Sequence, residues 1–358
     1  MANIIDYLTW RGDVPLAGVP FGDVDNLILS EFSYLLLEHA LPADGEMTVR
    51  ELNEALRDCP EAFGYIEREN NRIMLGLMAE GDRFAQAKVC LYRHETDTVR
   101  EKQFAAVTLL LGDGTAFVSF RGTDNTIVGW KEDFNLSFAC PVPAQADALC
   151  YLEEAARRFS IPIRVGGHSK GGNLAVYAAA NASPAVQSRL ISVYSNDGPG
   201  MDEATFSSEG YARIVGRLRS IVPQSSVIGI LLQHPEDYMV VRSSAFGIFQ
   251  HNPFSWQVLR GGFEVIEALQ PGSRNLDRVM KTWLGSMGQE ERMTMVDTMF
   301  SVLNATKAAT VENLGDGILR NASAMLAAVK SLDAATRRRV RHIMGGFFSA
   351  AVKRRMTR

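Results

Sequence analysis

Apolar side chains in the first part of the chain recur every three or four positions, the spacing at which they share one face of a helix. The stretch DVDNLILSEFSYLLLEHAL, residues 23–41, predicts an amphipathic helix with Asn26 as a candidate N-cap. The stretch EMTVRELNEALRDCP, residues 46–60, predicts a second helix that stops at Pro60. We therefore expect residues 1–100 to form a helical N-terminal segment that leads into the core.

The pattern changes near residue 103 to short apolar runs that alternate with helical stretches. FAAVTLLL and AFVSF flank a Gly-Asp-Gly turn and predict a hairpin. A helix is expected over residues 143–159 and another over 173–180, and further strands are expected in IPIRVG, LISVYSND, RLRSIVP and DYMVVRSSA. Strands that alternate with helices predict an α/β fold over residues 101–260, with a mostly parallel sheet covered on both faces.

From about residue 261 the periodicity predicts a helical C-terminal extension, residues 261–358. Its helix candidates are EVIEALQ, NLDRVMKTWLGSM, EERMTMVDTMFSVLNAT, DGILRNASAMLAAVKSL and TRRRVRHIMGGFFSAAVKRRM. The last of these belongs to a tail, residues 337–358, with eight Lys or Arg residues and no Asp or Glu. A basic amphipathic helix can lie on anionic lipid, so peripheral membrane contact is one hypothesis. The favoured one is a solvated helix end whose cations complement the helix dipole.

Composition narrows the class of protein. The 358 residues carry a formal net charge of −4 and 46% hydrophobic residues, which predicts a large core and gives no indication of a nucleic-acid partner. No run of about 18 uncharged apolar residues predicts a transmembrane helix. The N-terminus lacks a basic region followed by an apolar stretch, so secretion is not expected. The scattered cysteines, Cys59, Cys90, Cys140 and Cys150, show no metal-ligand spacing and fit a reducing, cytoplasmic compartment.

The chemistry centres on GGHSKGG, in which Gly167, Ser169 and Gly171 match G-x-S-x-G. A predicted strand precedes the motif and a predicted helix follows it, which is the context that a nucleophilic serine on a sharp turn requires. Side chains at the two glycines would collide with neighbouring backbone. The backbone N–H of Lys170, at the start of the helix, is a candidate donor to a developing oxyanion. The alternative, a phosphate-binding loop, does not fit the spacing.

A second oxyanion donor is expected at an earlier strand–loop junction. In AFVSFRGTDN the strand ends at Phe120, and Thr123 offers both a backbone N–H and a hydroxyl group. An ordinary polar turn is the equally weighted alternative from composition.

The base is chosen from six histidines: His39, His94, His168, His234, His251 and His342. When a G-x-S-x-G serine lies between a strand and a helix, the base follows it in the chain and lies in a loop after a late strand. His251 opens the loop QHNPFSW after such a strand, whereas His234 precedes the strand and is interpreted as a turn residue. The ring of His168 is expected to point away from the Ser169 hydroxyl.

The acid must lie between the serine and the histidine in the chain. Asp197 ends the strand LISVYSND and starts an Asp-Gly-Pro-Gly turn, and it would lie near Ser169 if the two strands are neighbours. Asp237 is the second choice, and Asp202 lies further into the loop. The competing interpretation of Asp197 is a simple turn residue.

Together, SFRGTD, GGHSKGGNLAVYAA, SNDGPG and QHNPFSW resemble the α/β-hydrolase superfamily. They look most like class 3 (fungal-type) lipases and an uncharacterised bacterial family of lipase-like hydrolases, over roughly residues 1–260. The resemblance implies an α/β-hydrolase fold with Ser169 as nucleophile, His251 as base, and Thr123 and Lys170 as oxyanion donors. Class 3 lipases carry their acid in a later segment, where SIVPQSSVIGIL here has no carboxylate. This difference supports Asp197 as the acid.

We therefore expect a carboxylic ester hydrolase that acts through an acyl-enzyme on small-molecule or lipid esters, with no cofactor or metal. The Lys170 side chain, where lipases carry an apolar residue, suggests a cation near the site and a preference for anionic substrates. The alternative function is a catalytically inactive hydrolase fold that serves as an interaction module.

Overall fold

The computed structural model describes residues 2–42, 44–64, 66–124, 126–136, 140–226, 228–229, 238–269 and 288–304. The chain forms two compact units. The first comprises residues 1–95, 104–122 and 143–273, and the second comprises residues 96–103, 123–142 and 274–358. The first unit holds most of the sheet and nearly all the candidate site residues, so it is described first.

A nine-stranded mixed sheet forms the centre of the fold, in the order β1-β2-β3-β4-β5-β6-β7-β8-β11. Strands β4 to β8 are parallel, whereas β1–β2, β3–β4 and β8–β11 pair antiparallel. The strands are β1 (Glu46–Thr48), β2 (Lys88–Asp97), β3 (Lys102–Leu110), β4 (Ala116–Phe120), β5 (Ile163–His168), β6 (Leu190–Asn196), β7 (Leu218–Pro223), β8 (Tyr238–Val241) and β11 (Val265–Ile266). Strands β9 (Val258–Leu259) and β10 (Gly262–Phe263) form a separate pair.

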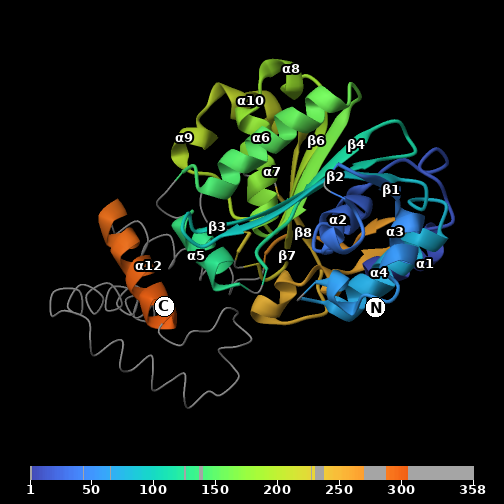
Figure 1. Cartoon of the computed structure of the whole chain (residues 1–358), viewed down its shortest axis with the longest axis horizontal. Coiled ribbons are helices and arrows are strands. Elements are labelled where there is room, and N and C mark those ends of the chain that lie inside the picture. Colours follow the sequence, from blue (N-terminus) through green and yellow to red (C-terminus); the bar gives the residue numbers. More distant parts are fainter. Residues whose placement is uncertain are drawn as a thin grey trace, which may run out of the picture. The chain divides into compact units, whose positions relative to one another are not determined.

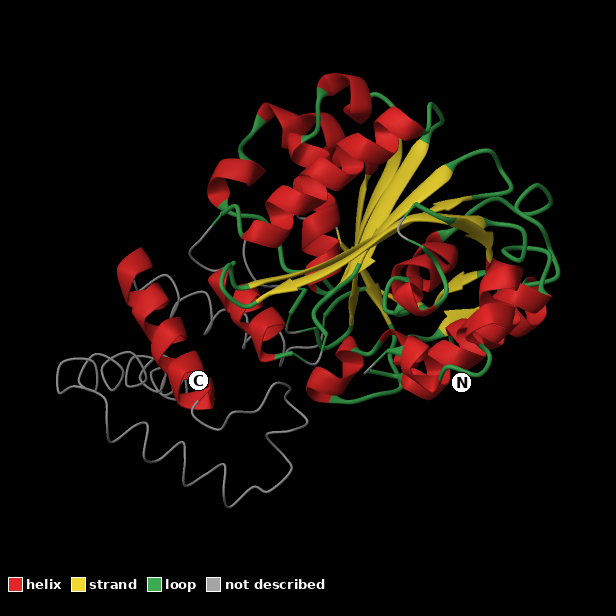
Figure 2. Ribbon diagram, viewed as in Figure 1, coloured by secondary structure: helices red, strands yellow, loops and turns green. Residues whose placement is uncertain are grey.

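Helices cover both faces of the sheet, as the alternating pattern predicts (Figures 1 and 2). One face carries α6 (Pro143–Arg158), α7 (Lys170–Asn181), α8 (Pro184–Gln187), α9 (Glu203–Phe206) and α10 (Glu209–Ile214), and the other carries α1 (Ile4–Arg11), α2 (Asp23–Phe32), α3 (Val49–Leu56) and α4 (Arg68–Glu80). Alternate side chains of one strand enter the two cores. In β4, Phe117 packs with the N-terminal helices, and Val118 packs with α6 and α7. The predicted hairpin and mostly parallel sheet are confirmed.

The N-terminal helix α2 is shorter than predicted and is capped differently. It ends at Phe32, and Gly22 is the N-cap residue, whose N–H donates to the Asp25 carboxylate at 2.8 Å. Asn26 is therefore not the cap. Its side chain is buried and donates to Asn196 Oδ1 on β6 at 2.8 Å. A polar residue in the first helical turn is used here for a tertiary contact, which the local pattern does not reveal.

Two further differences arise from strand pairing. Residues 1–100 contain β1 and β2 besides the helices that the periodicity predicts. The helix expected in EVIEALQ is wrong, because Val265 and Ile266 pair with Val241 and Val240 and extend the sheet beyond β8. The apolar residues of such a short segment fit either structure, and the neighbouring strand decides between them.

The second unit contains α5 (Ile127–Asn135) and α12 (Gln289–Asn304), which pack together. Lys131 on α5 bridges them through an ion pair with Asp297, with 2.9 Å between Nζ and Oδ1. Helix α12 confirms the helix predicted in EERMTMVDTMFSVLNAT. The candidate NLDRVMKTWLGSM before it and both candidates after it, including the basic tail, lie outside the described residues. Within the described part of the chain, no helix is both long and apolar enough to cross a bilayer.

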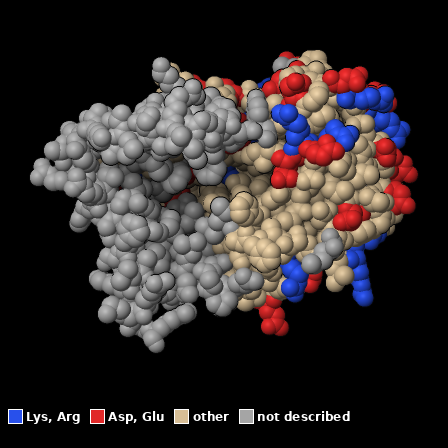
Figure 3. Space-filling model, turned by 90° about the horizontal axis from the view of Figure 1, so that it is seen from below, with Lys and Arg blue, Asp and Glu red and all other residues tan. Residues whose placement is uncertain are grey.

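The face seen in Figure 3 shows how charge is distributed on the described surface. Lysine, arginine, aspartate and glutamate side chains are interspersed around a broad area of uncharged residues. The described part of this face therefore presents no large field of one sign.

Candidate active site

The serine of the G-x-S-x-G motif lies at the junction of β5 and α7. Ser169 is the N-cap of α7 and has φ 59° and ψ −131°, a conformation that is strained for a residue with a side chain. A Cβ atom on Gly167 or Gly171 would lie 2.5 or 2.1 Å from the Phe120 carbonyl oxygen. Both positions therefore require glycine, which confirms the predicted steric reason for the motif. The turn leaves Ser169 half-buried at the carboxyl edge of the sheet.

Strand register places Asp197 beside this turn. His168 pairs with Asn196, and Asn196 pairs with Ile221 on the next strand. The Ser169 N–H donates to the Asn196 carbonyl at 2.9 Å, and the Asp197 N–H donates to the Ile221 carbonyl at 2.8 Å. The two predicted site residues thus follow the matched ends of adjacent strands.

Residues of the N-terminal helix α2 are hydrogen-bonded, through Asn196, to the turn that carries Ser169. The Asn196 amide nitrogen donates to the Gly167 carbonyl at 3.1 Å and to the Ser30 hydroxyl at 3.0 Å. Asn26 completes this buried cluster through its bond to Asn196. Helix α2 is therefore bonded to the strand ends that carry the serine and the aspartate.

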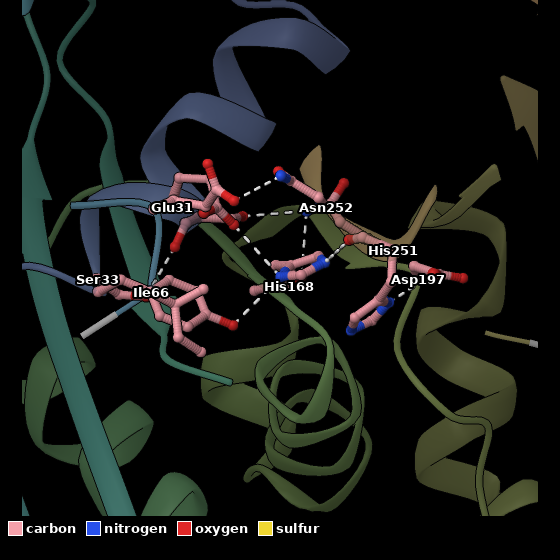
Figure 4. A network of polar contacts seen from close by, with 12 residues as sticks. Glu31, Ser33, Ile66, His168, Asp197, His251 and Asn252 are labelled. Atoms are coloured by element: carbon pink, nitrogen blue, oxygen red, sulfur yellow. Dashed lines mark hydrogen bonds and ion pairs between the residues drawn. The ribbon is translucent and has the colours of Figure 1, made fainter. Parts of the chain in front are cut away.

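The predicted base and acid are in direct contact. His251 ends a 3₁₀ turn, Gly247–His251, which follows β8, and its Nδ1 lies 2.6 Å from Asp197 Oδ2 (Figure 4). The Asp197 side chain is 1% exposed, whereas the His251 side chain is 29% exposed. The arrangement therefore has a buried carboxylate behind a partly accessible imidazole. The alternatives Asp237 and His234 lie outside the described residues.

Two further donors satisfy the buried Asp197 carboxylate. The Ser226 hydroxyl and the Gly229 N–H both donate to Oδ1, the latter at 3.1 Å. Both belong to SIVPQSSVIGIL, the segment in which class 3 lipases carry the acid. Here this segment provides hydrogen-bond donors to Asp197, the predicted acid, which directly follows β6. Ser226 was not predicted, although the hydroxyl residues in that segment were the available signal.

The two predicted oxyanion donors lie in different units. Lys170 opens α7, where the positive end of the helix dipole lies. Lys170 is 1% exposed as a whole residue, which does not fit the expectation that its ammonium group faces an anionic substrate. Thr123 belongs to the second unit, where its hydroxyl donates to Asp133. Its role as an oxyanion donor stays a prediction.

His168, which the sequence left without a role, is buried against His251. The ring centroids of the two histidines are 4.5 Å apart, and His168 Nε2 lies 2.8 Å from the His251 carbonyl oxygen. Burial lowers the pKa of His168 well below its usual value, and the nearby His251 adds to the effect. The ring is therefore neutral. Because a carbonyl oxygen only accepts, Nε2 carries the single proton and Nδ1 is an acceptor.

Glu31 and Tyr34 face the acceptor side of this ring. The Tyr34 hydroxyl lies 3.2 Å from His168 Nδ1, and Glu31 Oε1 lies 3.3 Å from the same atom. Burial raises the pKa of Glu31 to about 8, and the negative charge of Glu67 contributes to the increase. Glu31 is therefore protonated at neutral pH, and its contact with His168 is one between uncharged groups. Neither residue was predicted, because both precede the motif by more than 130 positions.

No group of three or more His, Cys, Asp or Glu side chains within the described ranges is arranged to hold a metal ion.

A strained serine between a parallel strand and a helix, on a sheet covered on both faces, is the arrangement of the α/β hydrolases. The chain belongs to the Mbeg1-like family, whose model matches residues 78–301. This match includes Ser169, Asp197 and His251, and it supports a lipase-like hydrolase at the level of the family. The predicted resemblance is thereby confirmed at that level.

Solved structures that are similar to part of the chain include two lipases. The crystal structure of M37 lipase is 15% identical, covers 59% of this chain and 70% of its own, and has a TM-score of 0.37. The Rhizomucor miehei lipase–propeptide complex is 16% identical, covers 67% of this chain and 81% of its own, and has a TM-score of 0.34. With TM-scores below 0.5, neither structure carries information about the activity of this chain. Among proteins with curated descriptions, none matches the sequence.

Proposed function

We propose that the protein is a serine hydrolase that cleaves carboxylic esters through Ser169, His251 and Asp197. The observation that carries the proposal is the 2.6 Å contact between His251 Nδ1 and the buried Asp197 carboxylate. A carboxylate in this position holds the imidazole in the tautomer that has its proton on Nδ1. Nε2 is then the acceptor for the proton of a nucleophilic hydroxyl group.

In the proposed reaction, Ser169 Oγ attacks the ester carbonyl carbon while His251 Nε2 accepts the hydroxyl proton. The Asp197 carboxylate stabilises the imidazolium that forms. Collapse of the tetrahedral intermediate breaks the bond to the alcohol, which leaves with the proton from His251. Water then attacks the acyl-enzyme by the same route and releases the carboxylic acid, so the net reaction consumes one water per ester.

The oxyanion of the tetrahedral intermediate requires hydrogen-bond donors. We assign the backbone N–H of Lys170 to this role, because it directly follows the nucleophile and opens a helix of 12 residues. A donor of this kind contributes about 3 kcal/mol to stabilisation of the transition state. Among enzymes, the resemblance favours a lipase or lysophospholipase over a thioesterase or peptidase.

A fluorophosphonate probe tests the proposal, because it reacts covalently only with an activated serine. We expect wild-type protein to be labelled at Ser169 and Ser169→Ala to be unlabelled. The matched control is Ser188→Ala, which removes an exposed hydroxyl that donates to Ala185. If wild-type protein with a normal thermal unfolding transition remains unlabelled, the alternative of an inactive interaction module replaces ester hydrolysis. The contact between His251 Nδ1 and Asp197 Oδ2 supports ester hydrolysis over this alternative.

A further inference from the structure

We propose that His168 is a positioning residue that sets the place of the base by donating a hydrogen bond from Nε2 to the backbone carbonyl of His251. This inference rests on the proposed function. The 2.8 Å contact joins the residue before the nucleophile to the base, which lies 83 positions later. Ser169 and His251 are thereby tied together through backbone and side chain, independently of the contact between Asp197 and the His251 ring.

The two contacts on His251 fix different degrees of freedom. The bond from Nδ1 to Asp197 fixes the direction of the ring, and the bond from His168 fixes the peptide group from which the ring projects. Both are needed because the imidazole must meet a hydroxyl group within hydrogen-bond reach, and an error of about 1 Å in such a position can cost about 100-fold in rate.

An uncharged partner is required at this position. The ring of His251 becomes an imidazolium when it accepts the serine proton, and the His168 ring centroid is only 4.5 Å away. A cation at that distance would oppose formation of the imidazolium. The deep burial of His168 keeps its ring neutral, so it can donate to the carbonyl without adding charge.

The N-terminal segment holds the other side of this contact. Tyr34 donates its hydroxyl proton to His168 Nδ1, because that nitrogen carries no proton when Nε2 does. Asn252, the residue after the base, donates to Glu67 Oε1 at 2.7 Å. Figure 4 shows the His168 ring between Glu31 and the backbone of His251, with Asn252 above it. The segments around α2 and before α4 thus hold both His168 and the loop that carries the base.

Three substitutions at position 168 separate the hydrogen bond from packing. The amide nitrogen of Gln is as many bonds from Cα as histidine Nε2, so His168→Gln keeps an uncharged donor near the His251 carbonyl. The amide of Asn is shorter and corresponds to Nδ1, so His168→Asn is polar but does not reach. His168→Leu fills a similar space without a donor. The control Tyr151→Phe removes a different buried hydrogen bond, from Tyr151 to the Leu91 carbonyl at 2.7 Å.

The measurements are the rate of fluorophosphonate labelling at Ser169 and the kcat and KM for a p-nitrophenyl ester, each corrected for the folded fraction. We expect His168→Gln to stay within about 3-fold of wild type, and His168→Asn and His168→Leu to lose about 10-fold or more in labelling rate and kcat with KM unchanged. Tyr151→Phe should unfold at a lower temperature and label at the wild-type rate.

The inference is overturned if His168→Asn and His168→Gln label equally fast, or if every loss follows the folded fraction as in Tyr151→Phe. Should His168→Leu fail to fold, the comparison of Gln with Asn still decides. A wild-type protein that is not labelled contradicts the proposed function instead, so the two failures are distinguishable.

Discussion

The Ser226 hydroxyl donates a hydrogen bond to Asp197 Oδ1, the carboxylate oxygen opposite the one that contacts His251. Ser226 is 1% exposed, so this donor is not readily replaced by water. A hydrogen bond to a charged group contributes about 1.5–3 kcal/mol to stability. A buried carboxylate that loses such a donor is destabilised, because water does not replace the missing bond.

We predict that Ser226→Ala lowers the free energy of unfolding by about 1–3 kcal/mol and also lowers kcat, because the carboxylate is less firmly held against His251. Urea unfolding and ester hydrolysis measure the two effects. Ser119→Ala is the control, because Ser119 donates at a buried site to the neutral Leu29 carbonyl. It should cost stability without lowering kcat. Equal catalytic losses in both variants would contradict a specific role for Ser226.

The acid itself is tested by Asp197→Asn. An amide at this position no longer favours the required tautomer of His251, and we expect kcat to fall by about 10⁴-fold. Asp237→Asn, which changes the other acid considered from the sequence, should retain wild-type kcat. Steady-state hydrolysis of a soluble ester distinguishes the two variants. A large loss in Asp237→Asn alone would transfer the role of acid to that residue.

Glu31 makes stability depend on pH in a defined direction. Its pKa is raised to about 8 in the folded protein, against an ordinary 4.5, so between these values the folded state keeps a proton that the unfolded state has released. The corresponding stability is present below pH 4.5 and is lost as the pH rises toward 8. We predict that Glu31→Gln, which stays uncharged, is increasingly more stable than wild type from pH 5 to pH 8.

Thermal unfolding at several pH values tests this prediction. The control is Glu69→Gln, at an exposed glutamate that pairs with Arg72. Its difference from wild type should change little over the same range. A constant difference between wild type and Glu31→Gln would show that Glu31 is ionised in the folded state.

His168 should remain neutral under mildly acidic conditions. Its pKa is lowered well below 6.5 by burial, so the unfolded state gains a proton before the folded state does. The folded protein therefore loses stability relative to His168→Gln as the pH falls below about 6.5. The ¹⁵N chemical shifts of the His168 ring at pH 6 should identify a neutral ring with its proton on Nε2. Shifts of an imidazolium would contradict the assignment.

Much of the fold could be predicted because its strands are short apolar runs separated by clear turns. The strands around Val165 and Val193 are largely buried on both sides, and their mostly apolar runs indicate this in the sequence. The residues that the pattern misassigned are those whose neighbours decide their structure. Asn26 resembles a helix cap but bonds to Asn196, and Val265 resembles a helical position but pairs with Val241.

The residues of the candidate site likewise fall into those that the local sequence marks and those that only tertiary packing brings together. Ser169, Asp197 and His251 could be proposed from the sequence because motif, chain order and strand ends constrain them. Glu31 and Tyr34 carry no local signal, and Ser226 is marked only by the hydroxyl residues of its segment. Tyr34 meets His168 across 134 positions, and only the packing of α2 against the sheet brings the two together.

The hydrogen bonds that join Asn196 to Asn26 and Ser30, and the one that joins Tyr34 to His168, have a practical consequence for recombinant work. A fragment limited to the family match, residues 78–301, would lack Asn26, Ser30 and Tyr34. The turn that carries Ser169 would then lose the hydrogen bonds that these residues make with Asn196 and His168. The Asn196 amide and the His168 ring would each lose a hydrogen-bond partner. Each group left unsatisfied would lower the free energy of unfolding by about 1–3 kcal/mol. Expression of the chain without its first helices is therefore expected to destabilise the turn that carries Ser169.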